Sequence, residues 1–290
     1  EIIGALVGLV ILLLAGDPLV RGAVNLSLRL GVPALIVSLT IVAFGTSAPE
    51  LLIGVQSVLE GAPGLALGNV VGSNTANILL VLGVPALLAG LPASGPEVRS
   101  SYVQMIAVTL LFIVVSYFGP ITWMHAGLLL LVFAYLMFTQ SRKALADRTI
   151  AEDDPEGADP TMAGWKIAAF LTAGLIGLPL GADLLVRNAS AIARDFGVTD
   201  EIIGLTLVAV GTSLPELATT VVAAMRKQAE VALGNVIGSN IFNLLLIIGV
   251  AGVVGPIPIP TAFLIFDMWV MLAASLVLIP TVYWGHKLGK

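Results

Sequence analysis

The sequence contains no cysteine, only two histidines and few charged residues. Without cysteine the chain has no disulfide, no thiol nucleophile and no thiolate ligand for a metal. His125 and His286 are the only histidines, which argues against a zinc centre. Charged residues make up 11% of the chain, whereas a typical soluble domain has roughly 25%. These shortages argue against a soluble protein.

Long apolar runs take the place of the missing charges. The 290 residues are 58% hydrophobic, with a mean hydropathy of +1.05. A helix needs about 20 apolar residues to cross a bilayer. Nine runs approach or exceed this length: 2–20, 33–58, 64–90, 101–118, 121–140, 164–185, 200–225, 229–254 and 262–284. They predict an all-α polytopic membrane protein, whose first run is a span and not a signal peptide, because no basic residues precede it.

A polar stretch divides the apolar runs into two groups. Residues 142–162 begin with basic side chains and continue as a proline-containing acidic segment with nothing to bury. We interpret 142–162 as a hydrophilic linker, 1–141 as the first membrane half with five spans, and 163–290 as the second half with four.

The two halves repeat each other. Residues 67–84 match residues 233–250 at 12 of 18 positions, with an offset of 166 and no gap. The same offset aligns Asp17 and Arg21 with Asp183 and Arg187. Composition bias alone does not produce matching Asn, Ser, Pro and Glu positions, so the chain contains an internal duplication.

A repeat unit of five spans places its second copy upside down in the membrane. The expected fold is therefore two inverted five-span repeats, a plan that recurs in secondary transporters. Ten spans are expected and nine are visible, because the counterpart of 121–140 would fall at about 287–306. We expect that the given chain is truncated before a tenth span.

The distribution of basic residues predicts the orientation. With the N-terminus outside, the inner loops hold eleven Lys and Arg residues and the outer loops hold two, Arg187 and Arg194. By the positive-inside rule, the N-terminus lies outside and the acidic linker lies in the cytoplasm.

A glutamate follows a proline inside one of the longest apolar runs. The motif is Gly45-Thr-Ser-Ala-Pro-Glu50, and it returns as Gly211-Thr-Ser-Leu-Pro-Glu216. A charged group at such a position is by default a functional-site hypothesis. Pro49 is expected to interrupt the helix and free the carbonyl of Gly45, with Gly45 easing the distortion. Thr46, Ser47 and Glu50 would then present oxygens on one side of the helix.

Serine and asparagine pairs extend this oxygen cluster. Ser73 and Asn77 lie four residues apart on one helix face, and Ser239 and Asn243 are their counterparts. Small-xxx-small glycines precede both pairs and allow close helix packing. All-oxygen shells suit Ca²⁺ and Na⁺. Two carboxylates neutralise one Ca²⁺ or two Na⁺, and without an ion they repel each other, so an empty site should be unstable or protonated.

Other polar residues carry weaker signals. Ser, Thr and Asn in membrane helices often hydrogen-bond only to backbones or neighbouring helices. Four further asparagines either belong to the site or only brace the broken helices: Asn69, Asn74, Asn235 and Asn240. Asp17 and Asp183 are expected to form ion pairs with the arginines four residues later.

These motifs resemble the cation/calcium exchanger superfamily, specifically the sodium/calcium exchangers and their prokaryotic relatives. The resemblance covers Gly-Thr-Ser-x-Pro-Glu and Gly-Asn-x-x-Gly-Ser-Asn-x-x-Asn, each present twice. It implies that Glu50 and Glu216 bind Ca²⁺ and Na⁺, that Na⁺ entry drives Ca²⁺ out, and that spans 1 and 6 slide against the rest. The implied assisting ligands are Thr46, Ser47, Ser73, Asn77, Thr212, Ser213, Ser239 and Asn243.

The resemblance has one departure and leaves alternatives. Some relatives, including potassium-dependent ones, carry aspartate where this chain has Asn243, which argues against potassium dependence. Proton/calcium exchangers resemble Gly-Asn-x-x-Glu instead, so H⁺/Ca²⁺ exchange ranks second. An intramembrane hydrolase lacks an activated nucleophile, and inverted repeats favour alternating access over a passive channel. We expect a monomeric antiporter in a prokaryotic plasma membrane, with Ca²⁺ and Na⁺ as cargo, no cofactor, no enzymatic activity and no nucleic-acid partner.

Overall fold

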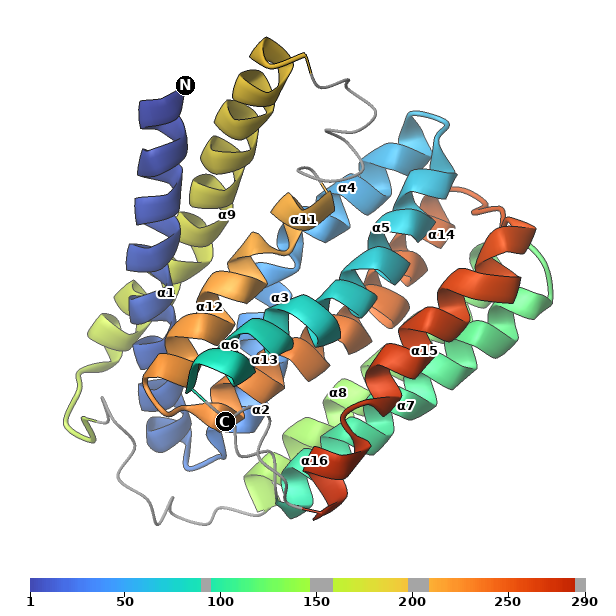
Figure 1. The fold of residues 1–290 in the computed structure, drawn as a ribbon. Helices are drawn as coiled ribbons and strands as arrows, with labels where there is room; N and C mark the ends of the chain where they lie inside the picture. Colours follow the sequence, from blue (N-terminus) through green and yellow to red (C-terminus); the bar gives the residue numbers. More distant parts are fainter. Residues whose placement is uncertain (90–94, 147–158, 198–208, 285–290) are drawn as a thin grey trace.

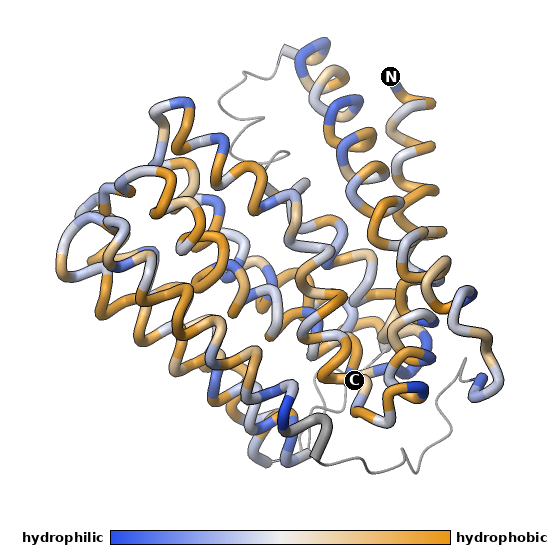
Figure 2. The backbone as a smooth tube through the Cα atoms, turned by 180° about the vertical axis from the view of Figure 1, so that it is seen from behind, coloured by the Kyte–Doolittle hydropathy of each residue, from blue (hydrophilic) through white to orange (hydrophobic). Residues whose placement is uncertain are grey.

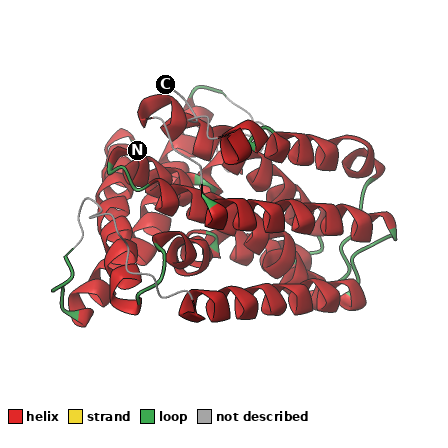
Figure 3. Cartoon of the chain, turned by 90° about the horizontal axis from the view of Figure 1, so that it is seen from below, coloured by secondary structure: helices red, strands yellow, loops and turns green. Residues whose placement is uncertain are grey.

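The computed structural model describes residues 1–89, 95–146, 159–197 and 209–284. Regular structure in these residues is helical, apart from one isolated bridge between Ile121 and Ile257 (Figure 3). The first half consists of α1 (Ile2–Leu30), α2 (Ala34–Val37), η1 (Ser38–Val42), α3 (Ala43–Thr46), α4 (Ala48–Leu59), α5 (Pro63–Ala76), η2 (Asn77–Leu82), α6 (Gly83–Ala89), α7 (Pro96–Tyr117) and α8 (Trp123–Ala146).

The second half begins with α9 (Gly164–Asp195). Its remaining helices are α11 (Ala209–Thr212), α12 (Leu214–Met225), α13 (Ala229–Ile241), η4 (Phe242–Ile247), α14 (Ile248–Val254), η5 (Phe263–Asp267), α15 (Met268–Leu276) and α16 (Ile279–Trp284). Segments marked η are π-helical. Five of the predicted runs are therefore divided into shorter helical segments by π turns or breaks.

The described helices confirm an integral membrane protein. Seven are long and apolar enough to cross a bilayer, and the bent pair 34–46 and 48–59 makes eight. The remaining predicted run, 200–225, is represented by α11 and α12, and its residues 200–208 lie outside the described chain. Many large hydrophobic side chains are exposed on the described helices, as lipid contact requires, and hydrophobic residues predominate along the backbone of the helices (Figure 2). Of the predicted linker, Arg142 to Ala146 continue α8, and 147–158 lie outside the described residues.

Helices α1 and α9, which the repeat relates to each other, lie side by side at one edge of the molecule (Figure 1). They are antiparallel: Gly8 meets Gly181 and Leu185, whereas Gly174 meets Leu19. A Cβ on Gly181 would lie 2.9 Å from the backbone nitrogen of Leu12. Glycine therefore allows the two backbones to touch.

Helix α13 lies at the centre of the fold. Its span, 229–254, is 83% buried, the highest value among the candidate spans of the described chain. It packs against α2, η1, α5, α7 and α12. Gly234 contacts the carbonyl of Leu35, and Gly238 contacts that of Leu39. The small-xxx-small prediction is thus confirmed for this pair. Among the described residues, a Cβ on Gly68 would meet only Phe263, at 3.9 Å, and a Cβ on Gly72 would meet no atom within 4 Å.

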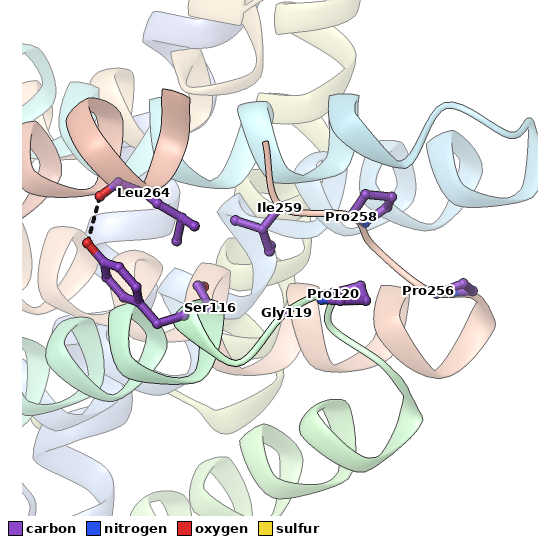
Figure 4. A pocket seen from close by; sticks show the side chains of 8 residues that line it. Ser116, Gly119, Pro120, Pro256, Pro258, Ile259 and Leu264 are labelled. Carbon is purple, nitrogen blue, oxygen red and sulfur yellow. Dashed lines mark hydrogen bonds between the residues drawn. The ribbon is translucent and has the colours of Figure 1, made fainter. Parts of the chain in front are cut away.

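One pocket, of about 480 Å³, opens where the α7–α8 and α14–η5 loops meet. Ile121 and Ile257 exchange backbone hydrogen bonds of 2.9 and 3.0 Å there. The lining is dominated by proline and apolar residues (Figure 4), and the hydroxyl of Tyr117, which also lines the pocket, donates to the carbonyl of Leu264 over 3.0 Å. Because no carboxylate lines this pocket, it does not have the chemistry of a cation site.

Gly238→Ala tests the central packing. The new Cβ would lie 2.5 Å from the carbonyl oxygen of Leu39 and 2.6 Å from the Cβ of Ala43. Overpacking against backbone should lower the unfolding free energy by about 1–3 kcal/mol, seen as a lower thermal unfolding midpoint in detergent. Gly127→Ala is the control, because its Cβ would meet no described atom within 4 Å. Equal midpoints for the two variants would contradict the close packing of α13.

Candidate functional site

Both proline–glutamate motifs form breaks between helices. The backbone leaves the helix at Ser47 (φ −86°, ψ 7°) and at Ser213 (φ −89°, ψ 5°). The two helices on either side of Ser47 bend by 45°. Pro49 and Pro215 occupy the first turn of the following helix, where the missing N–H needs no partner.

The prediction that the motif interrupts the helix is confirmed, whereas the expected distortion at Gly45 is wrong. The break falls at Ser47, and Pro49 begins the next helix rather than kinking a continuous one. Gly45 lies within regular α3 and is needed because a Cβ there would collide with the side chain of Leu175 on α9. Its role is close packing and not local distortion.

The break places each glutamate in the first turn of a new helix. Glu50 begins α4 and Glu216 begins α12, and each is 1% exposed. A helix N-terminus favours negative charge because its N–H groups point outward. The two carboxylates also lie close enough for their charges to repel each other. Like charges buried together need a cation or a proton.

The glutamate of the second half accepts hydrogen bonds from both halves. The hydroxyl of Ser47 donates to Oε1 of Glu216 over 3.0 Å, and Ser239 donates to the same oxygen over 3.5 Å. The other oxygen of Glu216 has no hydrogen-bond partner among the described residues. Glu216 thus keeps one free carboxylate oxygen while the other is anchored.

Threonine–asparagine contacts also cross between the halves. Thr46 donates to Oδ1 of Asn235 over 3.2 Å, and Thr212 donates to Oδ1 of Asn69 over 3.4 Å. Asn235 also donates to the carbonyl of Glu216 and to Thr220, over 3.3 and 3.1 Å. Asn69 has no equivalent of the bond to Thr220, because the first repeat has a glycine, Gly54, at the position that corresponds to Thr220. Its amide nitrogen has no partner in the described parts of the chain.

Asn77 and Asn243 lie where α-helix gives way to π-helix. Asn77 is the first residue of η2, and Asn243 is the second residue of η4. The sequence did not predict these turns, which occur frequently at functional sites. Asn77 donates to Asn240 over 3.0 Å and Asn243 donates to Asn74 over 2.9 Å.

Eight buried side-chain oxygens have no hydrogen-bond partner among the described residues, and six of them belong to residues predicted for the site. These six are Glu50 Oε2, Ser73 Oγ, Asn77 Oδ1, Ser213 Oγ, Glu216 Oε2 and Asn243 Oδ1. Buried polar atoms without partners are rare and need an explanation. Their helices pack together: α4 contacts α5 and η4, and α12 contacts α13 and η2. Such a set of oxygens suits a hard cation.

The ion pairs predicted on α1 and α9 are confirmed. Arg21 lies 3.1 Å from Asp17, and Arg187 lies 2.7 Å from Asp183. The sequence did not predict that Asp17 also pairs with Arg226 at the end of α12. No local spacing signals a contact between residues 209 positions apart.

A membrane-embedded helical fold with an internal repeat and buried acidic residues is typical of ion-transporting membrane proteins. The family model for sodium/calcium exchanger proteins matches residues 1–142 and 166–286. The chain belongs to this family of cation/calcium exchangers. It is a transporter and not an enzyme.

Several known proteins are similar over nearly the whole chain. The candidate antiporter CaxA of Alkalimonas amylolytica is 37% identical, over 98% of this chain and 89% of CaxA. The sodium/calcium exchanger MaX1 of Methanosarcina acetivorans is 33% identical, over 98% of this chain and 92% of MaX1. A structure of the sodium–calcium exchanger NCX_Mj, soaked with Na⁺ and Sr²⁺, superposes with a TM-score of 0.86 at 30% identity, covering 99% of this chain and 92% of that one.

A more distant relative has another ion specificity in its name. The Ca²⁺/H⁺ antiporter ChaA of Bacillus subtilis is 22% identical, over 80% of this chain and 72% of ChaA. The family assignment therefore establishes cation/calcium exchange, and it leaves the coupling ion open.

The asymmetry between Asn235 and Asn69 gives a testable difference. Asn235→Ala removes the buried hydrogen bonds to Thr46, to the carbonyl of Glu216 and to Thr220, and Thr46 keeps only its 3.3 Å bond to the carbonyl of Ala43. We expect it to lower the unfolding free energy by about 1–3 kcal/mol more than Asn69→Ala. Denaturation of the two purified variants in the same detergent measures this difference. A larger loss in Asn69→Ala would contradict the hydrogen bonding described for the site.

Proposed function

We propose that this protein exchanges Na⁺ for Ca²⁺ and that the bound ion lies between Glu50 and Glu216. The observation that carries the proposal is the set of six partnerless oxygens, two from carboxylates and four from neutral groups. Ca²⁺ takes six to eight oxygen ligands in flexible geometry. MaX1 and NCX_Mj, both named as sodium/calcium exchangers, support Na⁺ as the second ion.

Charge balance explains why the two ions would compete. One Ca²⁺ neutralises both carboxylates, and so do two Na⁺ ions. Either occupancy removes the repulsion between Glu50 and Glu216, whereas an empty site retains it. If exchange moves net charge, the membrane potential contributes about 2.3 kcal/mol per charge per 100 mV.

The remaining predicted ligands would complete the shell. Thr46 and Thr212 donate their protons to asparagines, so their oxygens keep lone pairs for an ion. Ser47 and Ser239 hold one oxygen of Glu216 in place. Potassium dependence is not expected, because this chain has a neutral asparagine, Asn243, where potassium-dependent relatives carry an aspartate.

Alternating access would use the α1–α9 pair. Glycines let the two backbones touch and apolar side chains pack beside them, so the pair would move as a unit against the rest of the molecule. We propose that the protein lies in a prokaryotic plasma membrane with its N-terminus outside and residues 142–162 in the cytoplasm. Because one chain supplies both glutamates, a monomer is sufficient for the site.

H⁺/Ca²⁺ exchange is the alternative, supported by the similarity to ChaA and by carboxylates that can carry protons. Purified protein in liposomes distinguishes the two. We expect an outward Na⁺ gradient to drive ⁴⁵Ca²⁺ uptake at equal pH on both sides, while a pH gradient without Na⁺ drives little. Uptake driven equally well by the pH gradient alone would reject sodium coupling.

Glutamine substitutions test the two carboxylates. Glu50→Gln or Glu216→Gln removes one of the two charges that balance Ca²⁺ while keeping the side-chain size. We expect Ca²⁺ flux to be abolished, with unchanged elution of the folded protein in gel filtration. Glu60→Gln is the control, because Glu60 is exposed at the end of α4 and pairs with Gln56. Wild-type flux in either site variant would reject the assignment.

A further inference from the structure

Four asparagines meet where the central helices of the two halves cross. Asn74 and Asn77 come from α5 and η2, and Asn240 and Asn243 come from α13 and η4. Each is 1% exposed. Asn74 and Asn240 are the same position of the repeat, 166 residues apart, and each donates its amide N–H to the other's backbone carbonyl, over 3.2 and 3.3 Å.

These backbone contacts fix how each amide is turned. A carbonyl oxygen only accepts hydrogen bonds, so the group of Asn74 that faces the carbonyl of Asn240 must be its NH₂. Oδ1 of Asn74 therefore points the other way, where it accepts a 2.9 Å bond from Asn243. Asn243 must present its own NH₂ to this oxygen. Its Oδ1 is then the end left over, buried without a partner among the described residues.

The same sequence of contacts runs in the opposite direction. The carbonyl of Asn74 accepts from Asn240, whose Oδ1 accepts a 3.0 Å bond from Asn77. Oδ1 of Asn77 is again left without a partner in the described chain. We call each chain of contacts a relay: one runs from the side chain of Asn74 to Asn243, and the other from the side chain of Asn240 to Asn77. The two relays share no side chain, because each takes only a backbone carbonyl from the other.

The segments that carry the free amide oxygens pack against the helices that carry the glutamates. Asn243 follows Ser239 by one helical turn, and Ser239 contacts Glu216. Segment η4 also packs against α4, which carries Glu50, and η2 packs against α12, which carries Glu216. An amide turned by 180° would present NH₂ groups, which are donors and cannot ligate a cation.

We propose that Asn74 and Asn240 are positioning residues for ion binding. Each orients the amide of a site residue in the opposite half, Asn74 acting on Asn243 and Asn240 on Asn77, so that carbonyl oxygens face the ion. This inference rests on the proposed function, since it takes Asn77 and Asn243 as ion ligands. It also explains the residue type: a side chain at position 74 or 240 must donate and accept at once, which an amide does and an ionised carboxylate or a leucine does not.

A double-mutant cycle tests the direction of this coupling. The variants are Asn74→Ala, Asn243→Ala and the double variant, with Ca²⁺ affinity measured by titration and KM by ⁴⁵Ca²⁺ uptake. Loss of an orienting partner typically weakens metal binding by about 10-fold or more. We expect Asn74→Ala to weaken binding to this degree in the native background and to have little further effect in the Asn243→Ala background.

The matched control lies on the same helix. Asn74 makes no relay bond to Asn77, so Asn74→Ala and Asn77→Ala should have independent, multiplicative effects. The mirror cycle pairs Asn240→Ala with Asn77→Ala and decides the matter if position 74 does not tolerate alanine. A purely structural role for Asn74 would couple equally to Asn77 and Asn243, and that result would overturn the proposal.

The cycle also separates this inference from the proposed function. If Asn243→Ala and Asn77→Ala leave Ca²⁺ affinity unchanged, these asparagines are not ligands and the proposed site is wrong. If both weaken binding but Asn74→Ala acts independently of Asn243→Ala, the site stands and the positioning role is rejected. Coupling confined to the cross-half pairs supports both.

Discussion

Two like charges buried in one low-dielectric interior are the constraint on which this structure depends. A single charged side chain at the centre of a membrane helix already costs about 2.5–3.5 kcal/mol on insertion scales, and Glu50 and Glu216 also repel each other. The surrounding features reduce this cost without removing it. Each glutamate begins a helix, hydroxyls bind one oxygen of Glu216, and the remaining oxygens are left for a cation.

Neither half of the chain completes its own half of the site. Ser47 binds Glu216, Thr46 binds Asn235, and the central asparagines bind one another across the repeat. Two inverted copies that cross at their most polar turns present the same donors and acceptors to each other in opposite directions. Some contacts therefore have a mirror contact, as Thr46–Asn235 and Thr212–Asn69 do. The contact of Ser47 with Glu216 has none, because the hydroxyl of Ser213 has no partner among the described residues. Thr220 and Gly54 show where the copies have diverged and the mirror contact is lost.

The fold and the family followed from patterns that the sequence carries locally. Apolar run length identified membrane spans, and the duplicated motifs identified the cation/calcium exchangers. The details of the breaks did not follow. Pro49 was expected to interrupt the helix with Gly45 easing the distortion, yet the break lies at Ser47, and Gly45 lies in a regular helix against the side chain of Leu175. The π turns at Asn77 and Asn243 were not predicted, because their stability depends on packing and not on the identity of one residue.

The sequence by itself determined the membrane class, the internal repeat, the two acidic residues and the short-range ion pairs, since each depends on neighbours within a few residues or on repetition along the chain. Tertiary structure alone decided which polar atoms are paired and which are free. Asn74 and Asn243 belong to different repeats, and nothing in their local spacing specifies that one amide turns the other. The physical reason is that hydrogen-bond direction is set by the partner across the helix crossing, and that partner is known only when the two halves are packed together.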